Sequence, residues 1–301
     1  MQHSELQRKK VRTASLSIFS NITLIILKLI AGLVSGSVSI ISEAIHSGMD
    51  LLAAIIAFFS IRVSGMPPDK NHQYGHGKFE NISGVIEALL IFIAAAWIIF
   101  EAVKKILHPE MPEQLGIGTL VMSISALVNF IVSRRLYKVG KETDSVALEA
   151  DGLHLKTDVY TSLGVAGGLM LIWITNIKII DPIIAILVAT LILYESYSLL
   201  KKAFKPLLDT PLPKDEISLI EETINKNLGK GMSFHMLRSR KAGPKRYVDL
   251  HLEVPGTITV NESHDLCDHI ENQIESVLAN IEVYIHIEPN NNIETPKENQ
   301  I

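Results

Sequence analysis

Six long apolar stretches fill the first two thirds of the chain and limit what it can fold into. They run over residues 14–35, 38–63, 80–103, 116–137, 147–175 and 179–200. A helix needs about 20 mostly apolar residues to cross the hydrocarbon layer of a membrane, and each stretch reaches that length. Hydrophobic residues make up 48% of the 301 residues and the mean hydropathy is positive, an average that soluble domains of this length seldom reach. We therefore predict a membrane all-α domain, a bundle of six transmembrane helices over residues 14–205.

The chain changes character after residue 205. Three prolines in the segment 206–213 prevent a helix from continuing, so this segment is predicted to link two domains. Residues 214–290 follow helix and strand periodicities in the order α-β-β-α-β, which predicts an α+β domain. Its predicted elements are a helix at 215–228, strands at 233–239 and 247–254, a helix at 261–278 and a strand at 282–288. Residues 291–301 are polar and are predicted to be disordered.

Basic residues gather at alternate ends of the predicted helices. They occur in residues 8–12, 70–78, 134–141 and 201–205, whereas the opposite loops hold only Lys104, Lys105 and Lys178. The excess of positive charge predicts that residues 1–13 and both chain ends are cytoplasmic.

Net charge and cysteine content limit the partners and the compartment of the protein. A net charge of −4 without a dense basic patch gives no reason to expect a nucleic-acid partner. The partner predicted from the apolar stretches is the lipid bilayer. The single cysteine, Cys267, cannot form an internal disulfide, which fits a soluble part in a reducing compartment.

Two of the apolar stretches carry the same pair of ionisable residues. The second holds His46 and Asp50, and the fifth holds His154 and Asp158. A spacing of four residues places the two side chains of each pair on one face of a helix. Two such faces brought together offer two imidazoles and two carboxylates, a tetrahedral set suited to Zn²⁺. Because an ionisable residue at bilayer depth is costly, the four residues are expected to have a function.

Alternatives to a transport site stay open for these pairs. A structural ion pair or a polar patch between helices would account for one His-x-x-x-Asp pair, but it does not require the same spacing twice. A membrane metalloenzyme needs an open coordination position, which four protein ligands do not leave, and the chain has no His-Glu-x-x-His motif. A membrane metal sensor needs only one anchoring helix, so it would leave the matched ligand pairs on two helices unexplained. We therefore predict a transporter of divalent metal ions and not an enzyme.

Over residues 12–289 the chain resembles the cation diffusion facilitator family, in its six predicted spans, its paired motifs and its terminal domain. The resemblance implies a ferredoxin-like terminal domain of metallochaperone type, and a transport site formed by His46, Asp50, His154 and Asp158. Several bacterial members carry Asp where this chain has His46. An imidazole in place of a carboxylate favours zinc and disfavours manganese or magnesium. Fe²⁺, Co²⁺, Cd²⁺ and Mn²⁺ remain the alternative substrates.

The loop between the second and third stretches offers a second set of metal ligands. Asp69, His72 and His76 lie within eight residues of one another. A solvated loop would account for them if they stood alone. Members of the resembling family often carry an Asp…His…His loop that binds a metal ion at the cytoplasmic membrane edge, so the resemblance implies a metal site here.

The α+β domain carries a third group of candidate ligands: His235, His251, His264, His286 and Glu288. Alternation along the strands places His251 on a polar face and puts His286 and Glu288 on the same side of the last strand. Isolated surface histidines are the alternative. The resemblance favours a metal site in which Glu288 bridges two ions, although relatives commonly have Asp at this position.

The resemblance also implies an assembly and a mechanism. Lys78 and Asp209 match a pair of residues that locks the membrane helices of a homodimer, whose soluble domains also associate. Protons compete with metal ions for imidazoles, which predicts metal/proton antiport by alternating access. The predicted setting is a bacterial inner membrane, with efflux of the metal ion and protons as counter-ion.

Overall fold

The computed structural model describes residues 2–35, 38–107, 117–175 and 179–290. The tail predicted to be disordered, residues 291–301, lies outside the described residues. The chain divides into two compact units, Met1–Phe204 and Lys205–Ile301.

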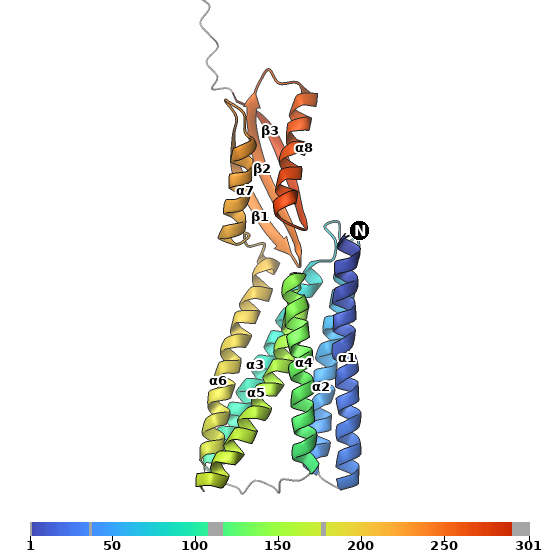
Figure 1. Cartoon of the computed structure of the whole chain (residues 1–301). Coiled ribbons are helices and arrows are strands. Elements are labelled where there is room, and N and C mark those ends of the chain that lie inside the picture. Colours follow the sequence, from blue (N-terminus) through green and yellow to red (C-terminus); the bar gives the residue numbers. More distant parts are fainter. Residues whose placement is uncertain (1, 36–37, 108–116, 176–178, 291–301) are drawn as a thin grey trace, which may run out of the picture. The chain divides into compact units, whose positions relative to one another are not determined.

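Six long helices make up the first unit (Figure 1). They are α1 (Gln2–Ser35), α2 (Val38–Ser64), α3 (Lys78–Leu107), α4 (Ile117–Glu142), α5 (Val146–Thr175) and α6 (Ile180–Phe204). Among the described residues, three stretches have the length and hydropathy needed to cross a membrane: Glu5–Ala31, Lys78–Lys104 and Pro182–Leu208. The predicted class, a helical membrane domain followed by an α+β domain, is confirmed.

The first helix extends beyond the predicted membrane span. It starts at Gln2, so residues 2–13, which were expected to precede the span, are also helical. Glutamine, leucine, arginine and lysine dominate this segment and all favour helices. Tertiary contacts also hold it, because Gln7 Nε2 donates to the carbonyl oxygen of Ile61 on α2 at 2.6 Å.

A buried ion pair fastens α1 to the start of α3. Lys10 pairs with Glu80, which is fully buried. Ser64 on α2 donates to Glu80 at 2.7 Å, and Ser145, between α4 and α5, donates to its other carboxylate oxygen. A buried carboxylate with a counter-charge and two hydrogen bonds is well compensated, so these contacts fix the helix ends next to the loop that carries Asp69.

Helix α5 is packed from two sides. One apolar cluster joins it to α3 and α6, through residues that include Ala88, Ala150 and Ile192. A second cluster joins it to α1, α2 and α4, through residues that include Ile61 and Leu155. The helix that carries His154 and Asp158 is therefore packed against α3 and α6 on one side and against α1, α2 and α4 on the other.

The contact between α4 and α5 is close at Gly152. A Cβ atom there would lie 3.1 Å from Tyr137 Cδ2 and 3.2 Å from Leu136 Cβ, both on α4. Ser133 on α4 also donates to the Gly152 carbonyl oxygen at 2.8 Å. Small residues allow helices in a membrane to approach in this way, and the approach brings α4 towards the predicted ligands on α5.

The second unit follows the predicted order of elements. It contains a 3₁₀ turn, Lys205–Leu208, then α7 (Lys214–Asn227), β1 (Ser233–Ala242), β2 (Lys245–Pro255), α8 (Val260–Val277) and β3 (Ile281–Asn290). The strand order is β1-β2-β3, with β2 antiparallel to β1 and parallel to β3. A parallel pair requires a crossover, which α8 provides. Gly243 takes a positive φ of 59° in the tight turn between β1 and β2.

Both helices of this unit pack on the same face of the sheet (Figure 1). The core between them consists of Ile220, Ile224, Val248, Leu250, Leu252, Val254, Cys267, Ile270, Ile274, Ile281 and Val283, with Leu212 at its edge. Side chains alternate along a strand, so the residues between these apolar positions point to the opposite face. That face carries His235, His251 and His286, the histidines of the three strands.

Candidate metal sites

Three of the four predicted transport ligands meet between α2 and α5. His154 Nε2 lies 3.0 Å from Asp50 Oδ1, and both side chains are largely buried. One ligand atom from each of Asp50, His154 and Asp158 lies within 4.8 Å of the other two. His154 and Asp158 are one turn apart on α5, so the helical spacing aims both at α2.

The fourth predicted ligand, His46, lies on α2 one turn before Asp50. Its side chain lies outside the described residues, so its part in the site stays a prediction.

Two asparagines support this cluster and are not apparent from the motif spacing. Asn129 Nδ2 on α4 lies 3.4 Å from Asp158 Oδ2, and Asn21 Nδ2 on α1 lies 3.4 Å from the carbonyl oxygen of Asp50. Both asparagines are buried. A buried amide needs a hydrogen-bond partner, so an asparagine inside an apolar stretch is the sequence signal that could have pointed to them.

Further polar groups lie buried near the cluster. Asp151, one turn before His154, accepts a hydrogen bond from Ser17 at 3.1 Å, and Glu87 accepts one from Ser83 at 3.1 Å. One oxygen of each carboxylate has no hydrogen-bond partner among the described residues. Lys28 is also buried and donates to Ser47 at 2.7 Å.

The loop ligands form a second cluster. His72 Nδ1 lies 3.3 Å from Asp69 Oδ1, and His76 Nε2 lies 3.4 Å from Asp69 Oδ2. The two imidazole centroids are 4.4 Å apart. A positive φ of 82° at Gly75 turns the chain just before His76, which is buried while Asp69 and His72 are exposed. One ligand atom from each of the three residues lies within 4.8 Å of the others, a spacing at which the three could hold one ion.

Two backbone amides donate hydrogen bonds to the Asp69 carboxylate of this loop. Asp69 Oδ1 accepts hydrogen bonds from the amides of His72 at 2.6 Å and Asn71 at 2.8 Å. The His72 amide above all lowers the pKa of the Asp69 carboxyl below its ordinary value. Asp69 is therefore ionised, as a metal ligand must be, to a lower pH than a free aspartate.

Strand register assembles the third cluster. His235 on β1 lies opposite His251 on β2, and His251 lies opposite His286 on β3. The imidazole centroids are 5.3 Å apart for the first pair and 4.8 Å for the second. The register of β1 shifts after His235, at Met236, whose φ is 51°. This bulge is the local irregularity that aims His235 along the row.

Glu288 lies at the centre of this row. Its Oε1 lies 2.8 Å from His251 Nδ1 and 3.7 Å from His286 Nε2, while its Oε2 lies 3.5 Å from His235 Nε2. The hydrogen bond with His251 is the main cause that lowers the pKa of the Glu288 carboxyl below its usual range. The two oxygens thus face different imidazoles.

The structure does not bring His264 to this cluster. His264 is exposed on α8 and lies 3.6 Å from Asp268, one turn further along the helix. Helix α8 covers the apolar face of the sheet, whereas the row of histidines occupies the opposite face. His264 is in none of the ligand clusters of the described residues, so its part in a metal site stays a prediction.

The predicted partners Lys78 and Asp209 belong to different units. Lys78 is the first residue of α3. Asp209 has a positive φ of 51° and lies 3.5 Å from Arg240 Nη1 within the second unit. The link between them stays a prediction.

Two family models match the chain in succession. The cation efflux transmembrane domain matches residues 14–208, and the cytoplasmic domain of cation efflux proteins matches residues 212–290. The chain belongs to the cation diffusion facilitator family. It is an integral membrane protein that transports metal cations, and it is not an enzyme.

Similar proteins occur in bacteria and archaea. The transporter sll1263 of Synechocystis sp. is 36% identical over 284 residues, which cover 94% of this chain and 91% of the relative. The transporter MJ0449 of Methanocaldococcus jannaschii is 34% identical, with 91% and 96% covered. The cation-efflux pump FieF of Shewanella oneidensis is 30% identical, with 91% and 92% covered. The likeness extends over both units.

Proposed function

We propose that this cation efflux transporter carries Zn²⁺ out of the cytoplasm in exchange for protons, through a site formed by His46, Asp50, His154 and Asp158. The observation that carries the proposal is the meeting of Asp50, His154 and Asp158 between two helices, with ligand atoms within 4.8 Å of one another. One imidazole and two carboxylates, completed by a second imidazole, form a nitrogen and oxygen set that suits zinc.

The distances in the cluster support an ion of this size. Tetrahedral zinc with bonds of about 2.0–2.2 Å holds its ligand atoms about 3.3–3.6 Å apart. The contact of 3.0 Å between His154 and Asp50 opens by a few tenths of an ångström to fit this geometry, and the wider separations close. The direct contact between these two side chains is thus exchanged for bonds to the substrate.

The same contact suggests how protons take part. A proton between His154 and Asp50 compensates the buried carboxylate when the ion is absent, and the ion displaces it, because a coordinating imidazole nitrogen must be unprotonated. An acidic exterior then favours release of zinc and uptake of protons, which return to the cytoplasm as the empty site turns inward. Alternating access of the helix bundle completes the exchange.

The remaining two clusters are assigned to regulation. The loop site, Asp69, His72 and His76, and the domain site, His235, His251, His286 and Glu288, would bind zinc from the cytoplasm. A metal ion bound only by the assembled form stabilises that form, so the domain site would favour a homodimer, with Lys78 and Asp209 as a further contact. His264 would contribute only from another subunit.

The proposal places six spans in a bacterial inner membrane with both termini in the cytoplasm, where basic residues concentrate at the ends of the helices. Alternative substrates are Fe²⁺, Co²⁺, Cd²⁺ and Mn²⁺, since the carboxylates also accept these ions. A membrane metal sensor is a second candidate, favoured only by the ligand clusters outside the bundle.

Flux measurements in proteoliposomes test the proposal. Zinc loaded on one side should cross when the unmodified protein is present and not in protein-free vesicles, with an opposite proton movement reported by a luminal pH dye. Asp50→Asn and Asp158→Asn should abolish both signals, whereas Glu142→Gln, which removes a surface carboxylate paired with Lys9, should not.

Competition between metals identifies the substrate in the same vesicles. Fe²⁺, Co²⁺, Cd²⁺ and Mn²⁺ should each compete less well than unlabelled Zn²⁺. Zinc flux that persists in the Asp158→Asn variant would show that the cluster is not the transport site, and an absence of flux in the unmodified protein would favour the sensor.

A further inference from the structure

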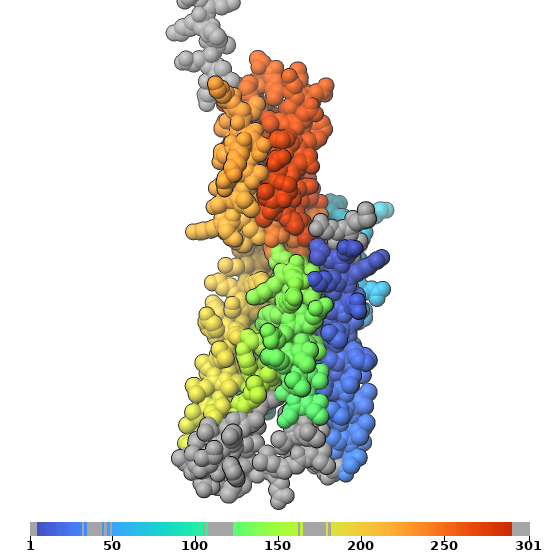
Figure 2. All heavy atoms as spheres, viewed as in Figure 1, coloured from blue at the N-terminus to red at the C-terminus, as the bar shows by residue number. Residues whose placement is uncertain are grey.

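A large groove lies among α4, α5 and α6, is also lined by Leu16 of α1, and is apart from the three clusters of candidate metal ligands. Its volume is about 1170 Å³, and none of the residues that line it belongs to a cluster of candidate metal ligands. Figure 2 shows this face of the bundle, with α4 in green and α6 in yellow. The groove is therefore independent of the proposed transport site.

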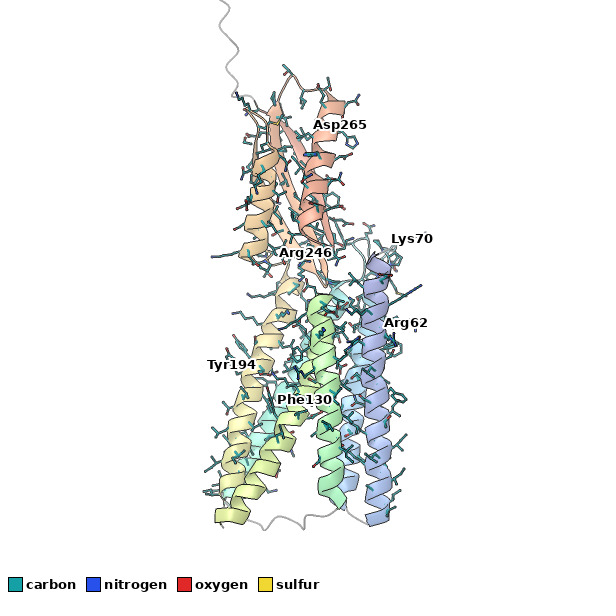
Figure 3. All side chains as sticks on the ribbon, in the orientation of Figure 1. Arg62, Lys70, Phe130, Tyr194, Arg246 and Asp265 are labelled. Carbon is teal, nitrogen blue, oxygen red and sulfur yellow. The ribbon has the colours of Figure 1, made fainter. Side chains whose placement is uncertain are left out.

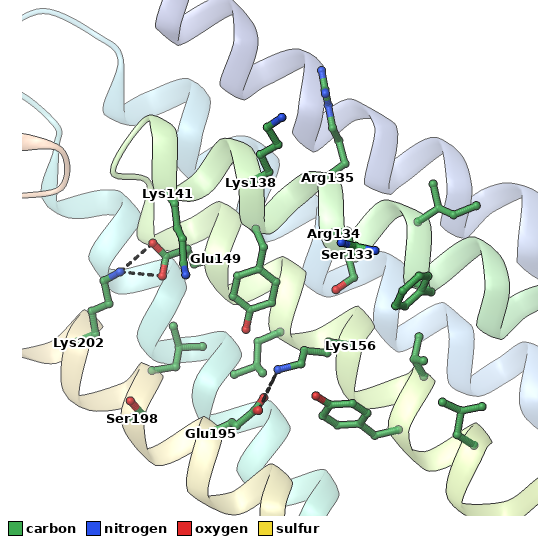
Figure 4. A pocket seen from close by; sticks show the side chains of 18 of the residues that line it. Ser133, Arg134, Arg135, Lys138, Lys141, Glu149, Lys156, Glu195, Ser198 and Lys202 are labelled. Atoms are coloured by element: carbon green, nitrogen blue, oxygen red, sulfur yellow. Dashed lines mark hydrogen bonds and ion pairs between the residues drawn. The ribbon is translucent and has the colours of Figure 1, made fainter.

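Cations are prominent in the lining. Six line the groove: Arg134, Arg135, Lys138, Lys141, Lys156 and Lys202. Two of these are paired, since Lys156 contacts Glu195 at 2.8 Å and Lys202 contacts Glu149 at 2.7 Å (Figure 4). The two glutamates are the carboxylates that line the groove.

The four cations on α4 differ from the paired ones. Arg134, Arg135, Lys138 and Lys141 are exposed, and within the described part of the chain none of them forms an ion pair with a carboxylate. They lie along the last turns of α4 and extend for about 10 Å of the helix. Arg135 and Lys138 also attract Glu142, which does not line the groove. With six cations and two carboxylates in its lining, the groove has an excess of positive charge that would accept an anionic group.

The lower part of the groove is apolar. Phe130, Ile131 and Leu163 line it and are 46%, 61% and 62% exposed. Figure 3 labels Phe130 on α4 and Tyr194 on α6, which lies on the other side of the groove. In a membrane protein, apolar side chains exposed on a helix bundle face acyl chains, and tyrosines concentrate at the level of the headgroups.

These two parts fit one kind of molecule. The interfacial layer of a bilayer is about 5–8 Å thick on each side, which places the end of α4 among the headgroups and Phe130 nearer the hydrocarbon. The positive-inside rule accounts for the cations at this end, but not for their position beside a groove with an apolar wall. A soluble anion would meet the cations and leave the apolar wall without a partner.

We propose that the groove binds an anionic phospholipid of the adjacent leaflet, with its phosphate between Arg134, Lys138 and Lys141 and its acyl chains along Phe130 and Leu163. Arg134 lies over the Phe130 ring at 5.4 Å, so the two parts of the site meet at this residue pair. The paired Lys156 and Lys202 close the far wall and are not needed for charge recognition.

Native mass spectrometry of the full-length protein in nonionic detergent tests the proposal. The probes are phosphatidylglycerol and phosphatidylcholine of equal acyl length, supplied in equal amounts. The unmodified protein should retain phosphatidylglycerol in preference. Each basic residue near a membrane surface contributes roughly a fivefold gain in affinity for anionic lipid, so Arg134→Gln/Lys138→Gln/Lys141→Gln should lower the affinity about 100-fold.

A matched variant separates the groove from general charge attraction. Arg8→Gln/Arg12→Gln/Lys201→Gln also removes three exposed cations, none of which lines the groove, and should leave binding within about fivefold of the unmodified protein. An equal loss in both triple variants would overturn the proposal, as would equal retention of the two lipids. Displacement of phosphatidylglycerol by inorganic phosphate would show instead a site for a soluble anion.

Discussion

The hydrogen bond from Asn129 to Asp158 should strengthen zinc binding without itself contacting the ion. Loss of a group that orients a metal ligand costs about 10–100-fold in affinity, which is about 1.4–2.7 kcal/mol. The separation of Asn129 Nδ2 and Asp158 Oδ2, 3.4 Å, is longer than that of a typical hydrogen bond. The lower limit therefore applies, and Asn129→Ala should raise the zinc dissociation constant about tenfold.

Ser125→Ala is the matched control for this prediction. Ser125 is buried one turn earlier on α4, and its hydroxyl has no hydrogen-bond partner among the described residues. Equilibrium zinc binding and the zinc concentration at half-maximal flux should both shift in Asn129→Ala and stay within about twofold in Ser125→Ala. An unchanged dissociation constant in Asn129→Ala, or an equal shift in the control, would refute the idea that α4 positions the Asp158 carboxylate.

Three further predictions concern the other clusters and the core. Asp69→Asn should weaken zinc binding at the loop by more than about tenfold in a competition titration, since loss of an outer partner alone costs that much. An unchanged titration would remove Asp69 from the site. The hydrogen bond with His251 is the main cause that lowers the pKa of the Glu288 carboxyl in the folded protein below its ordinary value of 4.5. The ionised carboxylate therefore stabilises the fold at pH values above 4.5, and this stabilisation is lost as the pH falls through the lower pKa of the folded protein. The zinc-free Glu288→Gln variant should therefore have a lower Tm than the unmodified protein near neutral pH, and the difference should vanish in acid; a constant difference would contradict this. Ile270→Ala should destabilise the second unit by about 2–5 kcal/mol, because it leaves a cavity in the core. Cys267 is a buried thiol whose pKa desolvation raises to about 11, so a thiol reagent at pH 8 reaches it mainly when the domain opens. The reagent should therefore label Cys267 faster in the variant, and an unchanged labelling rate would contradict the prediction.

Much of the architecture follows from patterns that are local in the sequence. Apolar runs of membrane length predict the helices, and period-two alternation predicts which side of β2 and β3 carries His251, His286 and Glu288. The spacing of four residues predicts that His154 and Asp158 share a face of α5. In each case the geometry of a single element determines the result.

Other features depend on contacts between elements that are distant in the sequence. Asn129 meets Asp158 because Gly152 allows α4 to approach α5, and neither motif contains that information. His264 shares a histidine-rich domain with the others, yet the position of α8 on the apolar face separates it from them. The groove beside α4 likewise arises only when residues of α1, α4, α5 and α6 are brought together.

The bulge at Met236 and the parallel pairing of β2 with β3 make the proposed metal ligands of the second unit depend on the correct register of its sheet. A slip of β3 by one residue would turn His286 and Glu288 towards the helices and would expose Ile285 and Ile287 to water. A misregistered sheet would therefore lose its apolar contacts and the proposed metal site in the same event. Only a correctly paired domain would then have the regulatory role proposed for it.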